Sequence, residues 1–295
     1  MRRPDFFIIG APRAGTTSLC SYLAAHPLIY FSPIKEPHFF STDYPDHPRP
    51  SEQEYESLFA AANGLHVAVG EGSTSYLSSL VAVPKILEYS PTSKFIVLLR
   101  HPVELAYSFH SHLVYHGGED VEDFERAWRL QPQRAADMCL PAHTPDARLL
   151  QYAKLYQLGA QLERLYQTVG RERILVHFLD DFRRNPAQGY ERTLAFLGVR
   201  SDGRGEFKAN NQSKKRRSRA LASLLGRLYE FKLSLGLNRS IGIGKLLDWA
   251  NTKPLPRESL TLEFRREMMD SFADDIRKLG KLTNRDLSSW LSINE

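Results

Sequence analysis

Short apolar runs alternate with amphipathic segments along most of the chain. Apolar, β-prone runs predict strands near 5–10, 67–71, 93–99 and 173–178, with a brief additional run at 28–31. The patterns between them predict helices near 15–25, 79–89, 102–116, 121–130, 147–168 and 186–197. Strands that alternate with helices favour a mostly parallel central sheet flanked by helices on both faces. The sequence therefore predicts an α/β fold with three layers.

The pattern changes near residue 200. A polar, basic stretch covers about 200–219, and helical periodicity returns at about 217–237 and 257–279. Residues 253–256, which include two prolines, indicate a loop. No internal repeat and no long low-complexity linker divides the sequence. We therefore expect residues 1–295 to form one domain, with a mobile basic loop at 200–219 and a helical C-terminal part from about 217.

Composition and charge narrow the class of protein. The chain has 295 residues, 42% hydrophobic and 25% charged, as in an ordinary globular protein. A formal net charge of +5 indicates an anionic ligand or partner, although charge alone does not indicate nucleic acid. Two cysteines, Cys20 and Cys139, cannot build a disulfide framework, which is typical of a reducing compartment. With no room for a signal peptide before the first strand and no run of roughly 20 apolar residues, we expect a cytoplasmic protein without a membrane span.

The segment 10–18 joins the first predicted strand to the first predicted helix. Gly10 and Gly15 keep the spacing of an NTPase P-loop, but Thr16 stands where that loop needs its lysine. Arg13 is the loop's only cation. Amides at a helix N-terminus favour an anion, and nearby hydroxyl groups add further donors. The loop suits a phosphate group but not a magnesium triphosphate; a plain tight turn is the open alternative.

A second candidate anion site follows the strand at 93–99. Arg100 comes at its carboxyl end, the sheet edge where ligands bind in open α/β folds. Pro102 begins the next helix, where a missing N–H costs least, and Ser108 lies about two turns further on. An arginine fork with a hydroxyl group binds phosphate well. Unless Arg100 is only a surface charge, the two sites indicate a nucleotide with phosphates at two separate positions.

These motifs resemble those of sulfotransferases that use 3'-phosphoadenosine 5'-phosphosulfate (PAPS). Residues 10–19 resemble the family's 5'-phosphosulfate loop, and residues 100–108 resemble its 3'-phosphate signature, R-x-P-x-E-x-A-x-S. Residues 35–40 and 70–77 are similar to the K-E-x-H-F-F and third-strand segments of one branch. That branch contains heparan-type carbohydrate sulfotransferases and many bacterial enzymes. The resemblance implies a P-loop-like fold and a transferase with PAPS as co-substrate.

The resemblance also implies where the donor binds. The 5'-phosphosulfate would be bound by the loop residues Arg13, Ala14, Gly15, Thr16, Thr17 and Ser18. Arg100 and Ser108 would bind the 3'-phosphate. A late basic loop carrying Arg217 and Arg219 would close over the nucleotide, the alternative being a solvated charge run.

Catalytic roles follow from the same resemblance. Glu36 would accept the acceptor's proton, with His38 as its helper or substitute, and Arg13 would stabilise charge on the sulfonate. The alternatives are that Glu36 forms a structural salt bridge with Lys35 or Arg13, and that His38 is a packed imidazole. The acceptor would be contacted by Lys35, Tyr76 and Tyr152, although tyrosines are more often simply core residues.

Three positions depart from the pattern of the carbohydrate enzymes. Arg13 stands where they usually carry lysine, Gly72 where several have another lysine, and Ser41 where an aspartate often follows. These changes weaken any assignment to a heparan-like glycan. The acceptor remains a hydroxyl or amine group of a carbohydrate, a lipid or a small molecule, and the oligomeric state remains open.

Two other functions compete with this one. A P-loop kinase or NTPase is disfavoured by Thr16 and by the lack of a clear Walker-B aspartate, since the strand at 93–99 ends in Arg100. A nucleic-acid binder using the basic cluster 208–219 lacks aromatic residues within that cluster and any known module. No residues have metal-ligand spacing, so we expect no metal.

Overall fold

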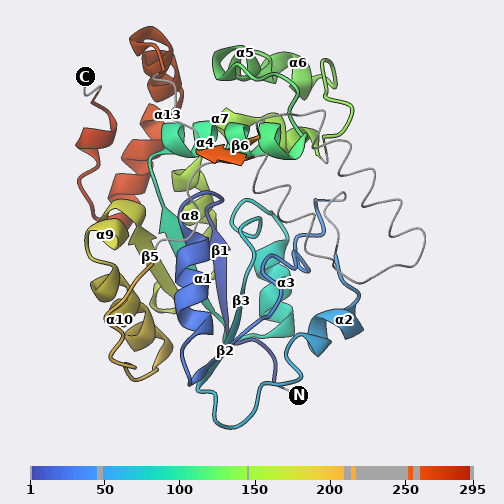
Figure 1. The fold of residues 1–295 in the computed structure, drawn as a ribbon. Coiled ribbons are helices and arrows are strands. Elements are labelled where there is room, and N and C mark those ends of the chain that lie inside the picture. Colours follow the sequence, from blue (N-terminus) through green and yellow to red (C-terminus); the bar gives the residue numbers. More distant parts are fainter. Residues whose placement is uncertain are drawn as a thin grey trace.

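A parallel sheet forms the centre of the chain in the computed structural model, which describes residues 2–44, 49–144, 146–208, 214–216, 252–254 and 260–292 (Figure 1). Its strands are β1 (Phe6–Gly10), β2 (Ile29–Phe31), β3 (Ala68–Gly72), β4 (Lys94–Leu99) and β5 (Ile174–Phe178). They pair in the order β2-β3-β1-β4-β5, each parallel to its neighbour. Every residue of β1 and β3 is buried, as expected of inner strands covered on both faces. The predicted α/β fold is confirmed.

Helices flank this sheet. They are α1 (Thr16–Ala24), α2 (Glu52–Ser57), α3 (Ala82–Tyr89), α4 (Pro102–His116), α5 (Phe124–Arg129), α6 (Gln131–Ala135), α7 (Tyr152–Leu155), α8 (Leu158–Thr168), α9 (Leu179–Arg184), α10 (Pro186–Leu197) and α13 (Leu262–Thr283). Short 3-10 turns occupy Ala147–Leu150, Arg171–Arg173 and Ser288–Trp290. In Figure 1, α4 runs across the end of the sheet at the top of the view. That end carries the carboxyl ends of the strands.

The helix predicted at 147–168 is wrong as a single element. The segment is divided into a 3-10 turn, α7 and α8, because side-chain amides replace the main-chain hydrogen-bond partners that a continuous helix would supply. The Gln131 side chain accepts from Ala153 N–H at 2.8 Å, and the Gln161 side chain donates to Leu155 O at 2.8 Å. Both glutamines are buried, so these bonds are shielded from water. Local periodicity does not reveal contacts of this kind.

The helix α2 was absent from the sequence predictions. A reciprocal capping box at its start stabilises it: Ser51 Oγ accepts from Glu54 N–H, and the Glu54 carboxylate accepts from Ser51 N–H at 2.7 Å. The helix buries only one side chain, Tyr55. With one apolar position it has no periodic pattern, so its capping residues were the available signal.

The C-terminal helix α13 confirms the described portion of the predicted helical C-terminal part. Thr261 caps its start by accepting from Phe264 N–H at 3.2 Å, and Asn284 ends it in the left-handed conformation. Its buried side chains recur at helical spacing: Phe264, Met268, Met269, Phe272, Ile276 and Leu279. The helix packs against α8. The single-domain organisation stays a prediction.

Part of the predicted basic loop is a strand. β6 (Lys214–Arg216) pairs antiparallel with β7 (Thr252–Pro254), so the loop assignment is wrong for those residues. A partner so distant in the chain gives no local signal, which is why the pairing was not predicted. Arg217 and Arg219 lie outside the described residues.

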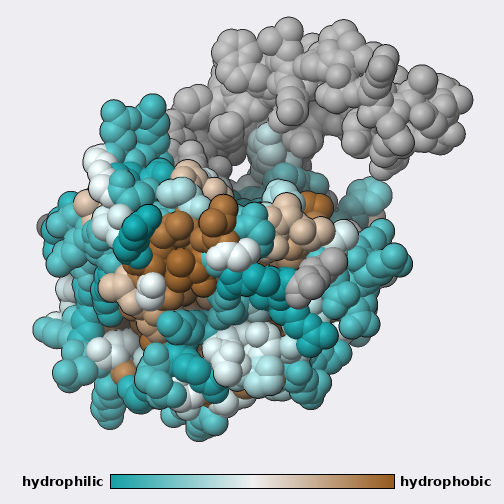
Figure 2. Space-filling view, turned by 90° about the horizontal axis from the view of Figure 1, so that it is seen from below, coloured by the Kyte–Doolittle hydropathy of each residue, from teal (hydrophilic) through white to brown (hydrophobic). Residues whose placement is uncertain are grey.

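The face at the amino ends of the strands is mostly polar. Figure 2 views the molecule from below and shows apolar areas bordered by polar side chains. Leu65 and Val67, which come just before β3, are among the exposed apolar side chains of the described chain. None of the described helices has the length and apolar character to cross a membrane. The candidate site lies at the opposite end of the sheet.

Candidate active site

Four neighbouring strands deliver the candidate residues to one edge of the sheet. The residues follow the carboxyl ends of β2, β3, β1 and β4, in the segments 35–38, 73–75, 11–15 and 100–108. Because parallel strands end at the same edge, segments far apart in the sequence meet there. This is the physical basis for the site predicted from separate motifs.

The loop after β1 has the backbone geometry of an anion cradle. Arg13 and Gly15 both lie in the left-handed region, with φ of 68° and 91°. The left-handed conformation favours glycine at position 15, where a Cβ atom would also lie 2.7 Å from Leu179 Cδ1 and displace that side chain. In the described chain no side chain caps the start of α1 at Gly15. The first amides of α1 are therefore available to an anionic group.

Arg13 joins this loop to α4. Its Nε donates to Ser108 Oγ at 3.2 Å, and Arg100 Nη1 donates to Arg13 O at 3.4 Å. Burial lowers the pKa of Arg13, and the neighbouring Arg100 charge lowers it further. The two motifs singled out in the sequence thus meet, and two like charges face the same region.

Arg100 is held in one orientation. Its Nε and Nη2 donate to Glu104 Oε2 at 2.8 and 2.5 Å, one helical turn along α4. Only 5% of the arginine is exposed. The next residue, His101, caps α4 by accepting from Val103 N–H at 3.3 Å, and its other ring nitrogen contacts Trp290 O at 3.0 Å. The cap and the C-terminal contact were missed in the sequence.

Tyr156 lies near the charges of Arg13 and Arg100. Its side chain is fully buried, and its hydroxyl group has no hydrogen-bond partner among the described residues. Burial raises the pKa of Tyr156, while the charges of Arg13 and Arg100 oppose that rise. A buried unpaired hydroxyl costs about 1–3 kcal/mol. The two arginines nearby therefore leave it without a hydrogen-bond acceptor, since guanidinium groups only donate.

The segment after β2 is fastened to the end of β3. Glu36 N–H donates to Gly72 O at 2.9 Å, and His38 N–H donates to Ser73 Oγ at 3.1 Å. Both Glu36 and His38 adopt left-handed backbone angles, with φ of 60° and 54°. Strain of about 1–3 kcal/mol at such residues is typical of functional sites. The two predicted catalytic side chains are thereby held next to each other.

Glu36 is an ionised carboxylate in this setting. Burial opposes its ionisation, but a hydrogen bond from His38 and the charge of Lys35 outweigh burial and lower its pKa to about 2. Oε1 forms an ion pair with Lys35, and Oε2 lies 3.4 Å from His38 Nε2. The salt bridge with Lys35 foreseen as an alternative is present. It keeps the carboxylate ionised, and the same contacts make it a weaker base than a free carboxylate.

Serine hydroxyl groups hold the ring of His38. Its Nδ1 shares a hydrogen bond with Ser75 Oγ at 2.8 Å, and Ser75 Oγ in turn contacts Ser41 Oγ at 3.0 Å. Ser41 Oγ also donates to His38 O at 3.0 Å. Ser41 is the residue that departs from the family pattern. Its contribution to orienting His38 was not visible in the sequence.

A fully buried carboxyl group supports the segment from below. Glu71 accepts from Tyr76 Oη at 2.8 Å, from Ser73 Oγ at 2.8 Å and from Tyr55 Oη at 3.2 Å. Burial raises the pKa of Glu71 to about 7, against the effect of these three donors. Because Ser73 also binds His38 N–H, the buried cluster fixes the catalytic segment to β3.

The acceptor role predicted for Tyr76 and Tyr152 is wrong for this conformation. Both side chains have no exposed surface. Tyr76 donates to Glu71, while Tyr152 donates to Glu119 Oε2 at 2.6 Å, beside the buried Arg134–Glu119 ion pair. Large aromatic side chains bring much apolar area to a core, and buried carboxylates satisfied their hydroxyl groups. Neither tyrosine reaches the cleft.

We expect the free energy of unfolding of the Glu71→Gln variant to depend less on pH than that of the wild type. The pKa of Glu71 is about 7 in the folded chain, above its ordinary value of 4.5. The stabilisation that protonated Glu71 gives the folded state is therefore fully present below about pH 4.5, and it is lost as the pH rises toward 7. The wild type should lose roughly 3 kcal/mol more than the variant across that interval. Urea unfolding at pH 4.5 and 7.5 measures this difference, with Glu88→Gln on the surface of α3 as control. Equal pH slopes in all three proteins would contradict it.

A cleft of about 360 Å³ opens beside Glu36 and His38. It is lined by Pro12, Glu36, His38, Tyr44, Thr74, Ser75, Ser78, Phe109, His112, Leu113, His116, Gly118, His143, Leu149 and Leu155. Burial and the neighbouring His116 lower the pKa of His112 to about 4, so this ring is neutral at pH 7. Lys35, predicted to contact the acceptor, pairs with Glu36 at the edge of the site.

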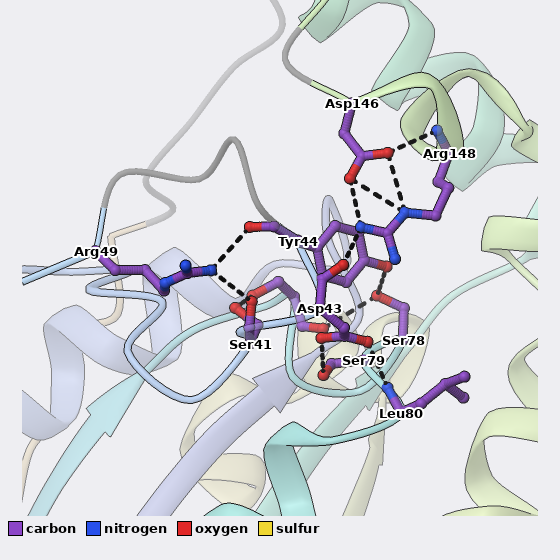
Figure 3. A network of polar contacts seen from close by, with 10 residues as sticks. Ser41, Asp43, Tyr44, Arg49, Ser78, Ser79, Leu80, Asp146 and Arg148 are labelled. Atoms are coloured by element: carbon purple, nitrogen blue, oxygen red, sulfur yellow. Dashed lines mark hydrogen bonds and ion pairs between the residues drawn. The ribbon is translucent and has the colours of Figure 1, made fainter. Parts of the chain in front are cut away.

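A polar network fixes one rim of the cleft (Figure 3). Tyr44 Oη donates to Ser78 Oγ at 2.9 Å, and the Arg148 guanidinium lies 4.3 Å from the centre of the Tyr44 ring. Arg148 also pairs with Asp146 at 2.5 Å. Asp43 accepts from Ser79 Oγ at 2.6 Å. These contacts tie the segment after the catalytic residues to the turn before α7.

Gly72, a position of departure from the carbohydrate enzymes, lies in a closed space. A Cβ atom there would approach Cys20 Sγ to 2.8 Å. A side chain at this position therefore requires the Cys20 side chain to shift. Among the described residues, no group of three or more His, Cys, Asp or Glu side chains is placed to hold a metal ion.

Known proteins of similar sequence are sulfotransferases. Mouse carbohydrate sulfotransferase 15 is 31% identical over a match that covers 36% of this chain and 26% of that protein. Human bifunctional heparan sulfate N-deacetylase/N-sulfotransferase 2 is 24% identical, covering 67% of this chain and 22% of that protein. The chain thus matches only about a quarter of the length of these relatives. No protein-family model matches the sequence.

Solved structures extend the similarity to the whole chain. A sulfotransferase from Alicyclobacillus acidocaldarius superposes with a TM-score of 0.73 at 27% identity, covering 99% of this chain and 100% of that one. A mouse sulfotransferase solved with PAP (3'-phosphoadenosine 5'-phosphate) has a TM-score of 0.52 at 13% identity. The match covers 96% of this chain and 88% of that one. The second likeness concerns the fold alone.

Proposed function

We propose that this chain, which belongs to the sulfotransferase family, transfers the sulfonate group of PAPS to a hydroxyl or amine group of an acceptor bound beside Glu36. The observation that carries the proposal is the contact of Arg13 with Ser108, which joins two anion-binding motifs into one site. The guanidinium groups of Arg13 and Arg100 both lie near this contact and near the buried Tyr156 hydroxyl. Such a site suits a nucleotide with a phosphate at each end.

In this proposal the two motifs bind the two ends of the donor. Arg100 and Ser108 hold the 3'-phosphate, while the amides before α1 and the hydroxyl groups of Thr16 and Thr17 hold the 5'-phosphosulfate. Anionic oxygens between Arg13 and Arg100 would relieve the repulsion of the two charges. The mouse structural neighbour, which shares the fold, was solved with PAP.

Transfer breaks the bond between sulfur and the 5'-phosphate oxygen and forms a bond between sulfur and the acceptor's oxygen or nitrogen. The acceptor's proton passes to Glu36, whose carboxylate is ionised and held beside the cleft. His38 lies close enough to share that proton. Arg13 stabilises the charge that develops on the leaving oxygen, an effect of about 2.7–4 kcal/mol per well-placed donor.

Binding of the product nucleotide tests the function directly. PAP at about 100 times its Kd should stabilise the protein by about 2.7 kcal/mol, which raises the Tm. AMP, which lacks the 3'-phosphate, should shift the Tm much less. Radiolabelled PAPS should then deliver label to an acceptor panel. Magnesium-dependent ATP hydrolysis without any effect of PAP would overturn the proposal.

Tyr156→Phe should have opposite effects on the free and the PAP-bound protein. Removing a buried, unpaired hydroxyl should stabilise the free chain by about 1 kcal/mol, since its desolvation is no longer uncompensated. The same change should shrink the PAP-induced rise in Tm, because the hydroxyl's partner is the bound anion. Thermal unfolding with and without PAP measures both. A variant that keeps the full PAP shift would remove Tyr156 from the donor site.

A cytoplasmic location is part of the proposal. Cys20 and Cys139 are both free thiols, and Cys139 is exposed. An exposed free thiol suits a reducing compartment. Fractionation of cells that express the protein at its native level tests the location.

A further inference from the structure

We infer that Trp290, in the 3-10 turn after α13, is a positioning residue for the donor. It acts through His101 on the start of α4, where the 3'-phosphate motif lies. This role rests on the proposed function, because it concerns how Arg100 and Ser108 are held for PAP.

The turn that carries Trp290 is fastened to the end of β5 and to α9. The Trp290 ring is 8% exposed and packs against the ring of Phe178, with centroids 5.8 Å apart. Arg285 Nη2 donates to Asp181 Oδ1 at 3.0 Å, and its guanidinium lies 4.1 Å from the centre of the same Phe178 ring. Figure 1 shows this C-terminal segment beside α9. The Trp290 backbone is thereby held at the carboxyl end of β5, the strand next to β4.

His101 connects this turn to α4. Its Nε2 lies 3.0 Å from Trp290 O, and its Nδ1 lies 3.3 Å from Val103 N. A carbonyl oxygen only accepts and a main-chain N–H only donates, so the ring is the neutral tautomer with its proton on Nε2. Burial lowers the pKa of His101, which favours the same neutral form. The Trp290 carbonyl therefore selects the tautomer that caps α4.

The indole ring of Trp290 also restrains the imidazole. The two ring centroids are 5.4 Å apart, so the His101 ring is packed as well as hydrogen-bonded. Without the turn, the imidazole is free to rotate and to carry its proton on Nδ1. In that tautomer Nδ1 cannot accept from Val103 N–H, and the helix loses its cap.

The capped turn carries the 3'-phosphate motif. Arg100 is the residue before His101, and its Nε donates to Glu104 Oε2 at 2.8 Å, in the first turn of α4. Ser108, further along the same helix, accepts from Arg13 Nε at 3.2 Å. A first turn without its cap frays, and the Arg100 fork then loses its fixed position relative to Ser108. The cost falls on the 3'-phosphate half of the donor site.

Calorimetric titration with PAP and with AMP isolates this half, because AMP lacks the 3'-phosphate. The ratio of Kd for AMP to Kd for PAP is the 3'-phosphate preference. Trp290→Ala and His101→Ala should each lower it by about 5-fold, which corresponds to the roughly 1 kcal/mol of one helix cap. His101→Asn should keep it, since an asparagine side chain caps a helix through its own oxygen. An undiminished preference in both alanine variants overturns the inference.

A double substitution tests whether Trp290 acts through His101. In the His101→Asn background, Trp290→Ala should leave the 3'-phosphate preference unchanged, because the cap no longer depends on the Trp290 carbonyl. The same 5-fold loss in both backgrounds would show that Trp290 acts by another route, contrary to the inference.

Trp128→Ala is the matched control for general destabilisation. This indole is also buried, with 6% exposure, and packs against Phe272 of α13 at a centroid distance of 5.8 Å. The variant should lower the Tm yet keep the 3'-phosphate preference. A loss of preference as large as that of Trp290→Ala would attribute both results to general destabilisation and overturn the role of Trp290. All variants are compared below the lowest Tm of the set.

Transfer kinetics give an independent readout. In Trp290→Ala the KM for PAPS should rise by about 5-fold while kcat stays nearly unchanged, because Glu36 and His38 are fastened to β3. Trp290→Phe, which keeps an aromatic ring against Phe178, should lose less than the alanine variant. A fall in kcat at unchanged KM would place the effect at the reacting groups and contradict the inference.

The two proposals fail differently. If the wild type does not prefer PAP over AMP, the proposed function is wrong. If the wild type prefers PAP and the alanine variants keep that preference in full, the function stands and Trp290 is only a packing residue.

Discussion

Glu36→Gln lowers the rate of sulfonate transfer by about 10²–10⁴-fold, the usual contribution of a general base, while PAP binding stays nearly unchanged. The substitution keeps the shape of the side chain but removes its ability to take a proton. The donor contacts of Arg13, Arg100 and Ser108 do not involve this carboxylate. Single-turnover transfer from radiolabelled PAPS gives the rate, and the PAP-induced change in Tm gives the binding.

Two further variants make the Glu36 result specific. Glu88→Gln, on the exposed surface of α3, should leave transfer unchanged. His38→Gln should slow transfer less than Glu36→Gln if His38 only supports the base. Transfer at the wild-type rate in Glu36→Gln would exclude Glu36 and make His38 the base. Activity should not fall between pH 8 and 5 through protonation of Glu36, because its pKa is about 2.

Arg100→Ala should abolish the rise in Tm caused by PAP. In the proposed complex this buried fork faces the 3'-phosphate, and truncating one member of a buried charge pair costs about 2–5 kcal/mol of binding free energy. The chain should still fold, since the partner Glu104 has a side chain that is 42% exposed and can be hydrated. Thermal unfolding with and without PAP provides the measurement.

The controls separate charge from geometry. Arg100→Lys keeps the charge but loses the planar fork, so it should retain only part of the PAP shift. Arg266→Ala, on the exposed face of α13, should keep the whole shift. A full shift in Arg100→Ala would show that the 3'-phosphate is bound elsewhere.

The local motifs were predictable because each depends on one short stretch of chain. The spacing from Gly10 to Thr16 defines a strand, a loop with left-handed residues and the start of a helix. Arg100 at a strand end and Pro102 at a helix start are equally local. Parallel strand order then brings both motifs to one edge of the sheet. Their meeting, through Arg13 and Ser108, was therefore foreseeable before any coordinates.

Contacts between distant segments were not predictable in the same way. Tyrosine is a residue type that suits acceptor binding. Tyr76 and Tyr152, however, are both buried, and each donates a hydrogen bond to a buried carboxylate. The predicted helix at 147–168 is interrupted by the amide side chains of Gln131 and Gln161. Each outcome depends on which partner packs against a segment, and the sequence around that segment does not contain this information.

By itself, the sequence determined the parallel α/β sheet, the loop with arginine in place of the P-loop lysine, and the choice of Glu36 and His38 as catalytic candidates. These features follow from short-range backbone geometry and hydrophobic periodicity. Only the tertiary structure decided the unpartnered hydroxyl group of Tyr156, the hydrogen bonds of Glu71 with Ser73, Tyr76 and Tyr55, and the cleft beside Glu36. Those features are made by side chains far apart in the chain, whose packing, burial and charge state are set by the folded chain as a whole.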